Sequence, residues 1–147
     1  LKGRFEASPN YNSKSHIINF SDNVDELSIE GKHEAYLDKW GTEIFRKISC
    51  KKNCLEIIDS SYISFDNDLE SRFILPSEIS LKKSSSNSIL INNFLEITFE
   101  GNIEILKDNY SEFYGQLSES TVIIVKSKNP KTTIRPLLDD NKERKFI

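Results

Sequence analysis

Two histidines, His16 and His33, and two cysteines, Cys50 and Cys54, are the residues of this chain best suited to acid–base, metal or thiol chemistry. Neither histidine belongs to a His-Glu-x-x-His motif, and the sequence contains no glycine-rich phosphate loop and no nucleophile elbow. Most hydrolytic and redox chemistries therefore lack their usual residues. His16 opens an expected strand and is interpreted as a surface residue, whereas His33 is either a hydrogen-bonded surface histidine or part of a site.

The cysteines stand on either side of a predicted turn in "RKISCKKNCLEIID". Residues 51–53 join two strand-like runs, and an asparagine in the third loop position suits the left-handed conformation that three-residue hairpins commonly need. Cys50 and Cys54 would then face each other with Cα atoms about 4.5–5.5 Å apart, within reach of a disulfide. A disulfide and a reduced pair are both open, whereas a zinc site lacks further ligands nearby.

Aromatic side chains could contact a sugar at two places. Tyr110, Phe113 and Tyr114 stand in polar surroundings just before a run of β-branched residues, where Gly115 indicates a bend. We expect the cluster to pack this bend against the sheet with one tyrosine at the surface, and sugar contact is the alternative. Trp40 is the sole tryptophan. Its face suits stacking on a sugar, and burial in a core or domain interface is the competing interpretation.

Short strands must position these residues. The run "FLEITFEG" alternates, with Leu95, Ile97 and Phe99 on one face and polar side chains on the other. Comparable runs at spacings of about 8–12 residues predict an all-β fold, an antiparallel two-sheet β-sandwich with little or no helix. The only helical candidate runs from Glu34 to Trp40. The comparable runs are "HIINF", "ELSIEG", "EIFRKIS", "CLEIIDS", "SRFILP", "SILIN", "NIEIL" and "STVIIVKS".

A single domain is expected over residues 1–147, because a chain of this length can bury about two thirds of its unfolded surface. Charged residues make up 29% and the net charge is −3, with both signs interspersed, so no nucleic-acid footprint is present. No apolar stretch approaches the roughly 18 residues of a membrane span. Since the chain begins at Leu1 rather than Met, we expect a processed product or a piece of a longer protein.

From about His33 onward, the order of motifs resembles the C-terminal β-sandwich domain of heparinase II/III-like polysaccharide lyases. A segment with Gly31, His33 and Tyr36 leads into a strand that contains Arg46, as in that family. Further similarities are a hairpin whose second strand ends in Asp59, the run "RFILP", the hairpin "LINNFLEITFEGNIEILKDN" and a Tyr-Gly pair before the last long strand. The similarity extends over most of the chain.

This resemblance implies an accessory domain that forms one wall of a cleft for β-elimination of an acidic, uronate-containing polysaccharide. In the family an N-terminal α/α-toroid supplies the catalytic tyrosine and histidine, so this C-terminal fragment would be inactive alone. The implied cleft or substrate-binding residues are His33, Tyr36, Trp40, Arg46 and Tyr114. His33 is also the candidate ligand of a structural zinc or calcium ion in the full-length parent, and the implied location is periplasmic or secreted.

Two departures bear on this interpretation. The segment "GRFEASPNYNSKS" has Arg4, Asn10 and Asn12 but lacks the histidine of the corresponding family element. A net acidic domain also repels an acidic glycan unless basic residues face the cleft. The candidates are Lys32, Lys39, Arg46 and Lys47.

Two alternatives stay open. Arg46 could be an outward polar residue or the partner of Asp59 instead of a cleft residue. The chain as a whole could be a stand-alone, non-enzymatic β module that binds glycans or proteins at the cell surface.

Overall fold

The computed structural model describes residues 15–34, 36–37, 41–62, 68–111 and 116–137, and all its elements are antiparallel strands. The predicted all-β, antiparallel fold is therefore confirmed. Within these residues no helix is long and apolar enough to cross a membrane. The strands are β1 (Ser15–Asp22), β2 (Glu26–His33), β3 (Ile44–Lys51), β4 (Cys54–Ser61), β5 (Leu69–Pro76), β6 (Leu81–Ser85), β7 (Ser88–Ile91), β8 (Leu95–Tyr110) and β9 (Ser118–Pro136).

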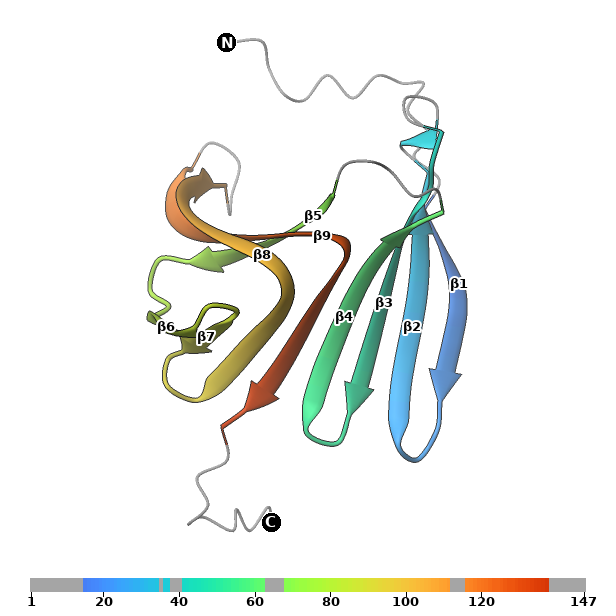
Figure 1. Cartoon of the computed structure of the whole chain (residues 1–147), viewed down its shortest axis with the longest axis horizontal. Helices are drawn as coiled ribbons and strands as arrows, with labels where there is room; N and C mark the ends of the chain where they lie inside the picture. Colours follow the sequence, from blue (N-terminus) through green and yellow to red (C-terminus); the bar gives the residue numbers. More distant parts are fainter. Residues whose placement is uncertain (1–14, 35, 38–40, 63–67, 112–115, 138–147) are drawn as a thin grey trace.

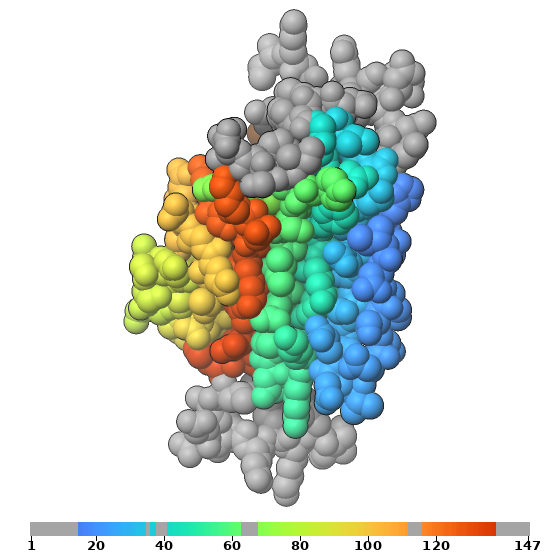
Figure 2. Space-filling model, turned by 45° about the vertical axis from the view of Figure 1, so that its right-hand side comes forward, coloured from blue at the N-terminus to red at the C-terminus, as the bar shows by residue number. Residues whose placement is uncertain are grey.

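The described strands form one nine-stranded sheet in the order β1-β2-β3-β4-β9-β8-β7-β6, with β5 paired to β9 outside this path (Figure 1). Figure 2 shows β9, β4, β3, β2 and β1 side by side along one side of the molecule. The sequence predicted two sheets, whereas the topology joins all strands into one. The reason is that β8 and β9 are long enough to take part in both halves of the strand arrangement.

The hairpin of β8 and β9 bends sharply where its register shifts. Glu100 pairs with Lys131 and Asn102 pairs with Lys126, so Gly101 alone lies opposite four residues of β9. Gly101 adopts φ +150°, a conformation that other residues rarely take. On one side of the bend, the first half of β9 pairs with β5. On the other side, its second half pairs with β4.

The hydrophobic core lies inside this bend. Phe73 of β5 packs against it, with its ring centroid 6.2 Å from that of Phe99. Phe99 is 1% exposed, so residues from both halves of the sheet share one core. The central core residues are Ile89, Ile91, Ile97, Phe99, Ile123 and Val125.

Strands β1–β4 continue the sheet away from the core and have an apolar face and a polar face, because side chains alternate along each strand. Residues paired directly across strands share a face. One apolar row therefore runs through Phe20, Ile29, Ile48, Ile57, Thr132 and Phe99. The adjacent row on the other face runs through Glu30, Lys47, Ile58, Lys131 and Glu100.

The turn between β3 and β4 is shorter than predicted. Lys51 pairs with Cys54, so the loop has two residues rather than three. Cys50 pairs instead with Leu55, which places the two cysteines on opposite faces of the hairpin. Both are free, and the expectation that they face each other is corrected.

The left-handed asparagines occur at another turn. Asn92 and Asn93 have φ values of 48° and 59°, and they join β7 to β8 in a three-residue loop closed by Ile91 and Leu95. Asparagine tolerates this conformation better than most residues. The left-handed asparagine of a three-residue loop, which was expected at Asn53, therefore occurs at Asn92 and Asn93 instead.

We predict that Gly101→Ala destabilises the fold by about 1–3 kcal/mol. A Cβ at this position would lie 2.8 Å from the Lys126 carbonyl oxygen, and φ +150° is itself strained for alanine. Urea unfolding measures the change. Gly31→Ala is the control, since its added Cβ would meet no atom closer than 3.4 Å, and a loss as large as that of Gly101→Ala would contradict the account of the bend.

We predict that Phe99→Ala lowers the free energy of unfolding by about 3–5 kcal/mol, because it leaves a cavity in the shared core. Phe94→Ala should cost far less, because Phe94 is 53% exposed. Thermal or urea denaturation of both variants tests this. Equal losses would mean that the core does not lie inside the bend.

Candidate functional site

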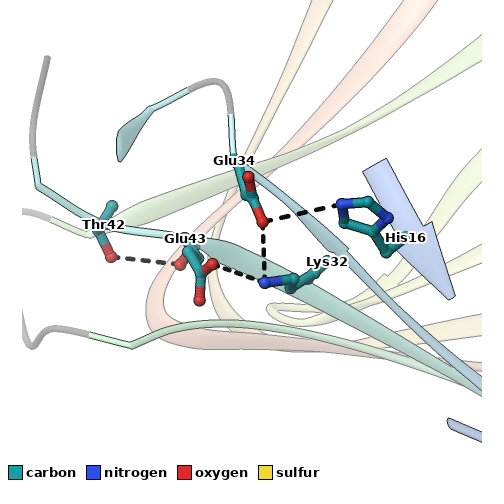
Figure 3. A network of polar contacts seen from close by, with 5 residues as sticks. All are labelled: His16, Lys32, Glu34, Thr42 and Glu43. Carbon is teal, nitrogen blue, oxygen red and sulfur yellow. Dashed lines mark hydrogen bonds and ion pairs between the residues drawn. The ribbon is translucent and has the colours of Figure 1, made fainter. Parts of the chain in front are cut away.

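Polar side chains gather where β1 begins, β2 ends and the segment before β3 runs past them (Figure 3). The Lys32 ammonium lies 2.9 Å from Glu34 Oε1 and 2.8 Å from Glu43 Oε1. His16 Nε2 lies 3.9 Å from the same Glu34 oxygen. Thr42, which is 1% exposed, donates its hydroxyl to the Glu43 carbonyl at 3.2 Å. The Lys32 ammonium thus joins the end of β2 to the segment before β3, and Glu34 links both to His16 of β1.

The electrostatics of this network keep Lys32 charged. Its hydrogen bonds to Glu43 and then to Glu34 raise the pKa of Lys32 above its ordinary value. The carboxylates of Glu34 and Glu43 share this ammonium. Lys32 is therefore neutralised by its neighbours and does not present a free positive charge to an acidic glycan.

His33 and Tyr36 are brought together at the same end of the sheet. Their ring centroids are 5.9 Å apart with the planes tilted by 60°. Tyr36 is 40% exposed. A half-exposed tyrosine beside an imidazole offers an aromatic surface and hydrogen-bonding groups, which is a combination suited to a sugar. Of the five predicted cleft residues, these two are adjacent in the structure.

The two histidines lie on opposite faces of the sheet. His16 pairs with Lys32, while His33, the next residue of β2, pairs with Ser15 and Ile44. Among the described residues no group of three or more His, Cys, Asp and Glu is placed to hold a metal ion. The described part thus does not provide a metal site by itself, and His33 as a ligand stays a prediction that needs partners from elsewhere.

Arg46 is held by Asp59, as one of the sequence alternatives had it. Arg46 Nε and Nη2 donate to the two carboxylate oxygens at 2.6 and 2.8 Å. Asp59 is 6% exposed and also accepts a hydrogen bond from the Ser71 hydroxyl of β5, which is 2% exposed. These bonds to Asp59 raise the pKa of Arg46. Asp59 of β4 therefore ties β3 and β5 together through Arg46 and Ser71, and part of the Arg46 side chain is left at the surface.

The basic residues between positions 32 and 47 do not form one patch. Lys32 and Lys47 lie on the polar face, whereas Arg46 lies on the apolar face, since neighbours in β3 alternate. Lys32 and Arg46 are already paired with carboxylates. Lys39 lies outside the described residues. The expected basic wall is therefore absent from the described part of this segment.

Several sequence candidates cannot be placed. Trp40, Phe113 and Tyr114 lie outside the described residues, as do Arg4 and the asparagines near the start of the chain. The part of the aromatic cluster that is described is Tyr110, at the end of β8. A shallow hollow of about 300 Å³ lies beside it, lined by Lys107, Asp108, Asn109 and Glu119.

Sequence reasoning missed Glu43 and Ser71. The spacing of Lys32 and Glu34 could have revealed their contact, because residues two apart extend on one side of a strand. Nothing in the sequence indicates that Glu43 returns to Lys32 across the intervening segment, or that β5 brings Ser71 to Asp59.

The fold is similar to part of heparan sulfate lyase HepC from Pedobacter heparinus. The match has a TM-score of 0.64 and 10% sequence identity, and it covers 84% of this chain and 22% of the lyase chain. A HepC mutant matches with a TM-score of 0.62, 11% identity and the same coverage. Neither a protein-family model nor a curated protein sequence matches the chain. The predicted resemblance to a heparinase-like β domain is confirmed at the level of the fold.

We predict that Arg46→Ala lowers the free energy of unfolding by about 1–3 kcal/mol, because the buried Asp59 carboxylate loses its charged partner. The cost stays below that of a fully buried pair, since the Arg46 side chain is 48% exposed. Arg72→Ala is the control, because its pair with Glu70 lies at the surface and should contribute about 0–1 kcal/mol. Chemical denaturation compares them, and equal effects would argue against a structural role for Arg46.

Proposed function

We propose that this chain is the accessory β domain of a heparinase II/III-like polysaccharide lyase. In this proposal it forms one wall of a cleft in which an acidic, uronate-containing polysaccharide undergoes β-elimination. The observation that carries the proposal is the similarity of the fold to part of HepC over 84% of this chain. The chain spans 22% of the lyase's length, so the rest of the machinery would come from the N-terminal toroid of a parent polypeptide.

The chemistry of β-elimination explains why this domain would be inactive alone. The reaction removes the proton next to a carboxylate and expels the 4-linked oxygen, which requires a base, an acid and stabilisation of an enolate-like intermediate. His33 and Tyr36 are two such groups, but they stand in ring contact, and the proposal gives them the role of orienting sugar at the wall. The reacting base and acid would belong to the toroid.

The charge distribution limits where the glycan would lie. The two carboxylates of Glu34 and Glu43 exceed the single positive charge of Lys32. A polyanion is therefore disfavoured at the surface that these three residues form. His33 and Tyr36 lie in ring contact and present an aromatic surface. We therefore assign the sugar to these two rings, and the partly exposed Arg46 lies on the same sheet face as His33.

The family metal and the location belong to this proposal as well. A structural zinc or calcium ion in the parent would use His33 together with ligands from outside the described residues. A two-sheet sandwich would require strands beyond the one sheet described here. Periplasmic or secreted location follows from the lyase interpretation alone.

We predict that Tyr36→Ala in the parent lyase raises KM for a uronate-containing polysaccharide about tenfold, the equivalent of ~1.4 kcal/mol of lost binding. Activity is followed by the ultraviolet absorbance of the unsaturated product, with heparan sulfate tested first. Phe94→Ala is the matched control, because it removes an exposed ring at the turn between β7 and β8 and should leave KM unchanged.

Two results would contradict the proposal. One is turnover by the isolated 147-residue chain, which would make it an enzyme in its own right. The other is a parent protein that cleaves no uronate-containing polysaccharide. Tight oligosaccharide binding by the isolated chain, combined with an inactive parent, would favour the stand-alone binding module instead.

A further inference from the structure

The sheet ends in three strands that, among the described residues, have a neighbouring strand on one side alone. These edge strands are β1, β6 and β5, and β5 pairs with β9 (Figure 1). The free side of an edge strand presents backbone N–H and C=O groups that can pair with a strand of another chain. The three edges differ in the side chains that oppose such pairing.

Two of the edges carry residues that hinder association. β6 contains Lys82 and Lys83. β5 contains Glu70 and Arg72 and ends at Pro76. Charged side chains and proline are common means by which proteins keep an edge strand from pairing with another chain. Both β5 and β6 therefore have the composition of protected edges.

β1 is the edge without this protection. Its sequence, SHIINFSD, contains no lysine, arginine, proline or glycine, and seven of its eight residues are exposed. Ile17 is 69% exposed, Ile18 is 45% exposed and Phe20 is 62% exposed. An exposed edge with several apolar side chains is expected to associate with another strand.

A β-bulge determines which residues of β1 share a face. The register with β2 passes from Ile17 to Asn19, so Ile18 is the extra residue. Because of this insertion, Ile17 and Phe20 lie on the same face of the sheet, whereas residues three apart in a regular strand lie on opposite faces. Ile17 pairs with Gly31, which has no side chain to cover it.

We propose that β1 pairs antiparallel with β1 of a second copy of this chain, in the register that places Ile17 opposite Phe20. Residues directly opposite each other in a sheet share a face. The bulge satisfies this condition, because it brings Ile17 and Phe20 to one face. The other opposed residues that share a face are His16 with Ser21 and Ser15 with Asp22.

The symmetry of this pairing limits its size. The two-fold axis passes between Ile18 and Asn19, and each copy offers the same residues to the other. Since β1 of each chain is then occupied, the assembly closes at two copies. An eight-residue strand is about 26 Å long, so the interface is small and we expect a dissociation constant in the micromolar range. Both faces of the sheet stay open, including the His33 and Tyr36 end.

Sedimentation velocity of the 147-residue chain tests the pairing. We expect a change from monomer to dimer between about 1 and 100 µM. Ile17→Lys should weaken the dimer at least about tenfold, because it places a charge opposite Phe20, as lysines protect the edge of β6. Ile74→Lys is the matched control, since Ile74 is 58% exposed on β5 and the change in net charge is the same. It should leave the dissociation constant unchanged.

A charge-pair experiment tests the register. Phe20→Glu should also weaken self-association. In an equimolar mixture of Ile17→Lys and Phe20→Glu, the introduced lysine lies opposite the introduced glutamate, and the remaining Phe20 lies opposite the remaining Ile17. Opposite charges at directly opposed positions stabilise a strand pair, so we expect the mixed dimer to be at least about tenfold tighter than either variant alone. Far-ultraviolet circular dichroism checks that each variant is folded.

Four results would overturn the inference. They are a chain that stays monomeric at about 100 µM, equal dissociation constants for Ile17→Lys and Ile74→Lys, growth beyond two copies, and a mixture that associates no more tightly than its components. None of these measurements involves sugar or lyase activity. A monomeric chain from an active parent lyase would therefore refute the pairing alone, and a dimeric chain from an inactive parent would refute the proposed function alone.

Discussion

The bend of the β8 and β9 hairpin is the constraint on which the rest of the fold depends. Gly101 opposite four residues of β9 lets a single pair of strands turn through the molecule, so that β5 can pair on one side of the bend and β4 on the other. The core forms where the two halves meet around Phe99. Everything from β4 to β1 extends from this core as an open continuation of the same sheet.

The fold class was predictable because alternation is a local property. The run around Leu95 to Phe99 identifies both its strand and its buried face, and the same reasoning finds the other strands except β6 (Leu81–Ser85). The segment from Leu81 to Ser88 was expected to be a solvated loop because it is rich in lysine and serine, and that expectation was wrong. The register of the turn after Cys50 was not predictable, since a shift of one residue moves every side chain to the other face. The joining of all strands into one sheet was equally hidden, because it depends on the bend at Gly101, and a glycine in the sequence does not by itself indicate which conformation it adopts.

The candidate site shows the same division. Pairing of Arg46 with Asp59 could be foreseen from adjacent strands, but the third member, Ser71, comes from β5 after a gap in the described chain. The basic segment from Lys32 to Lys47 looked like one patch in sequence and is split by strand alternation and by ion pairs. Among the described residues, only the contact of His33 with Tyr36 keeps two predicted cleft residues together, and it does so at the end of β2, next to the edge strand β1.

These features give the chain two surfaces with different physical characters. The end with His33 and Tyr36 is polar and aromatic, whereas the face with Phe20 and Leu27 is largely apolar and also carries Asp22 and the ion pair of Arg46 with Asp59. The central claim is that the first contacts sugar while the chain serves as the wall of a lyase cleft. The most direct test is a structure of the parent protein with a bound uronate oligosaccharide. The account predicts a sugar ring in contact with Tyr36, and an oligosaccharide bound in a cleft to which this domain contributes no residue would contradict it.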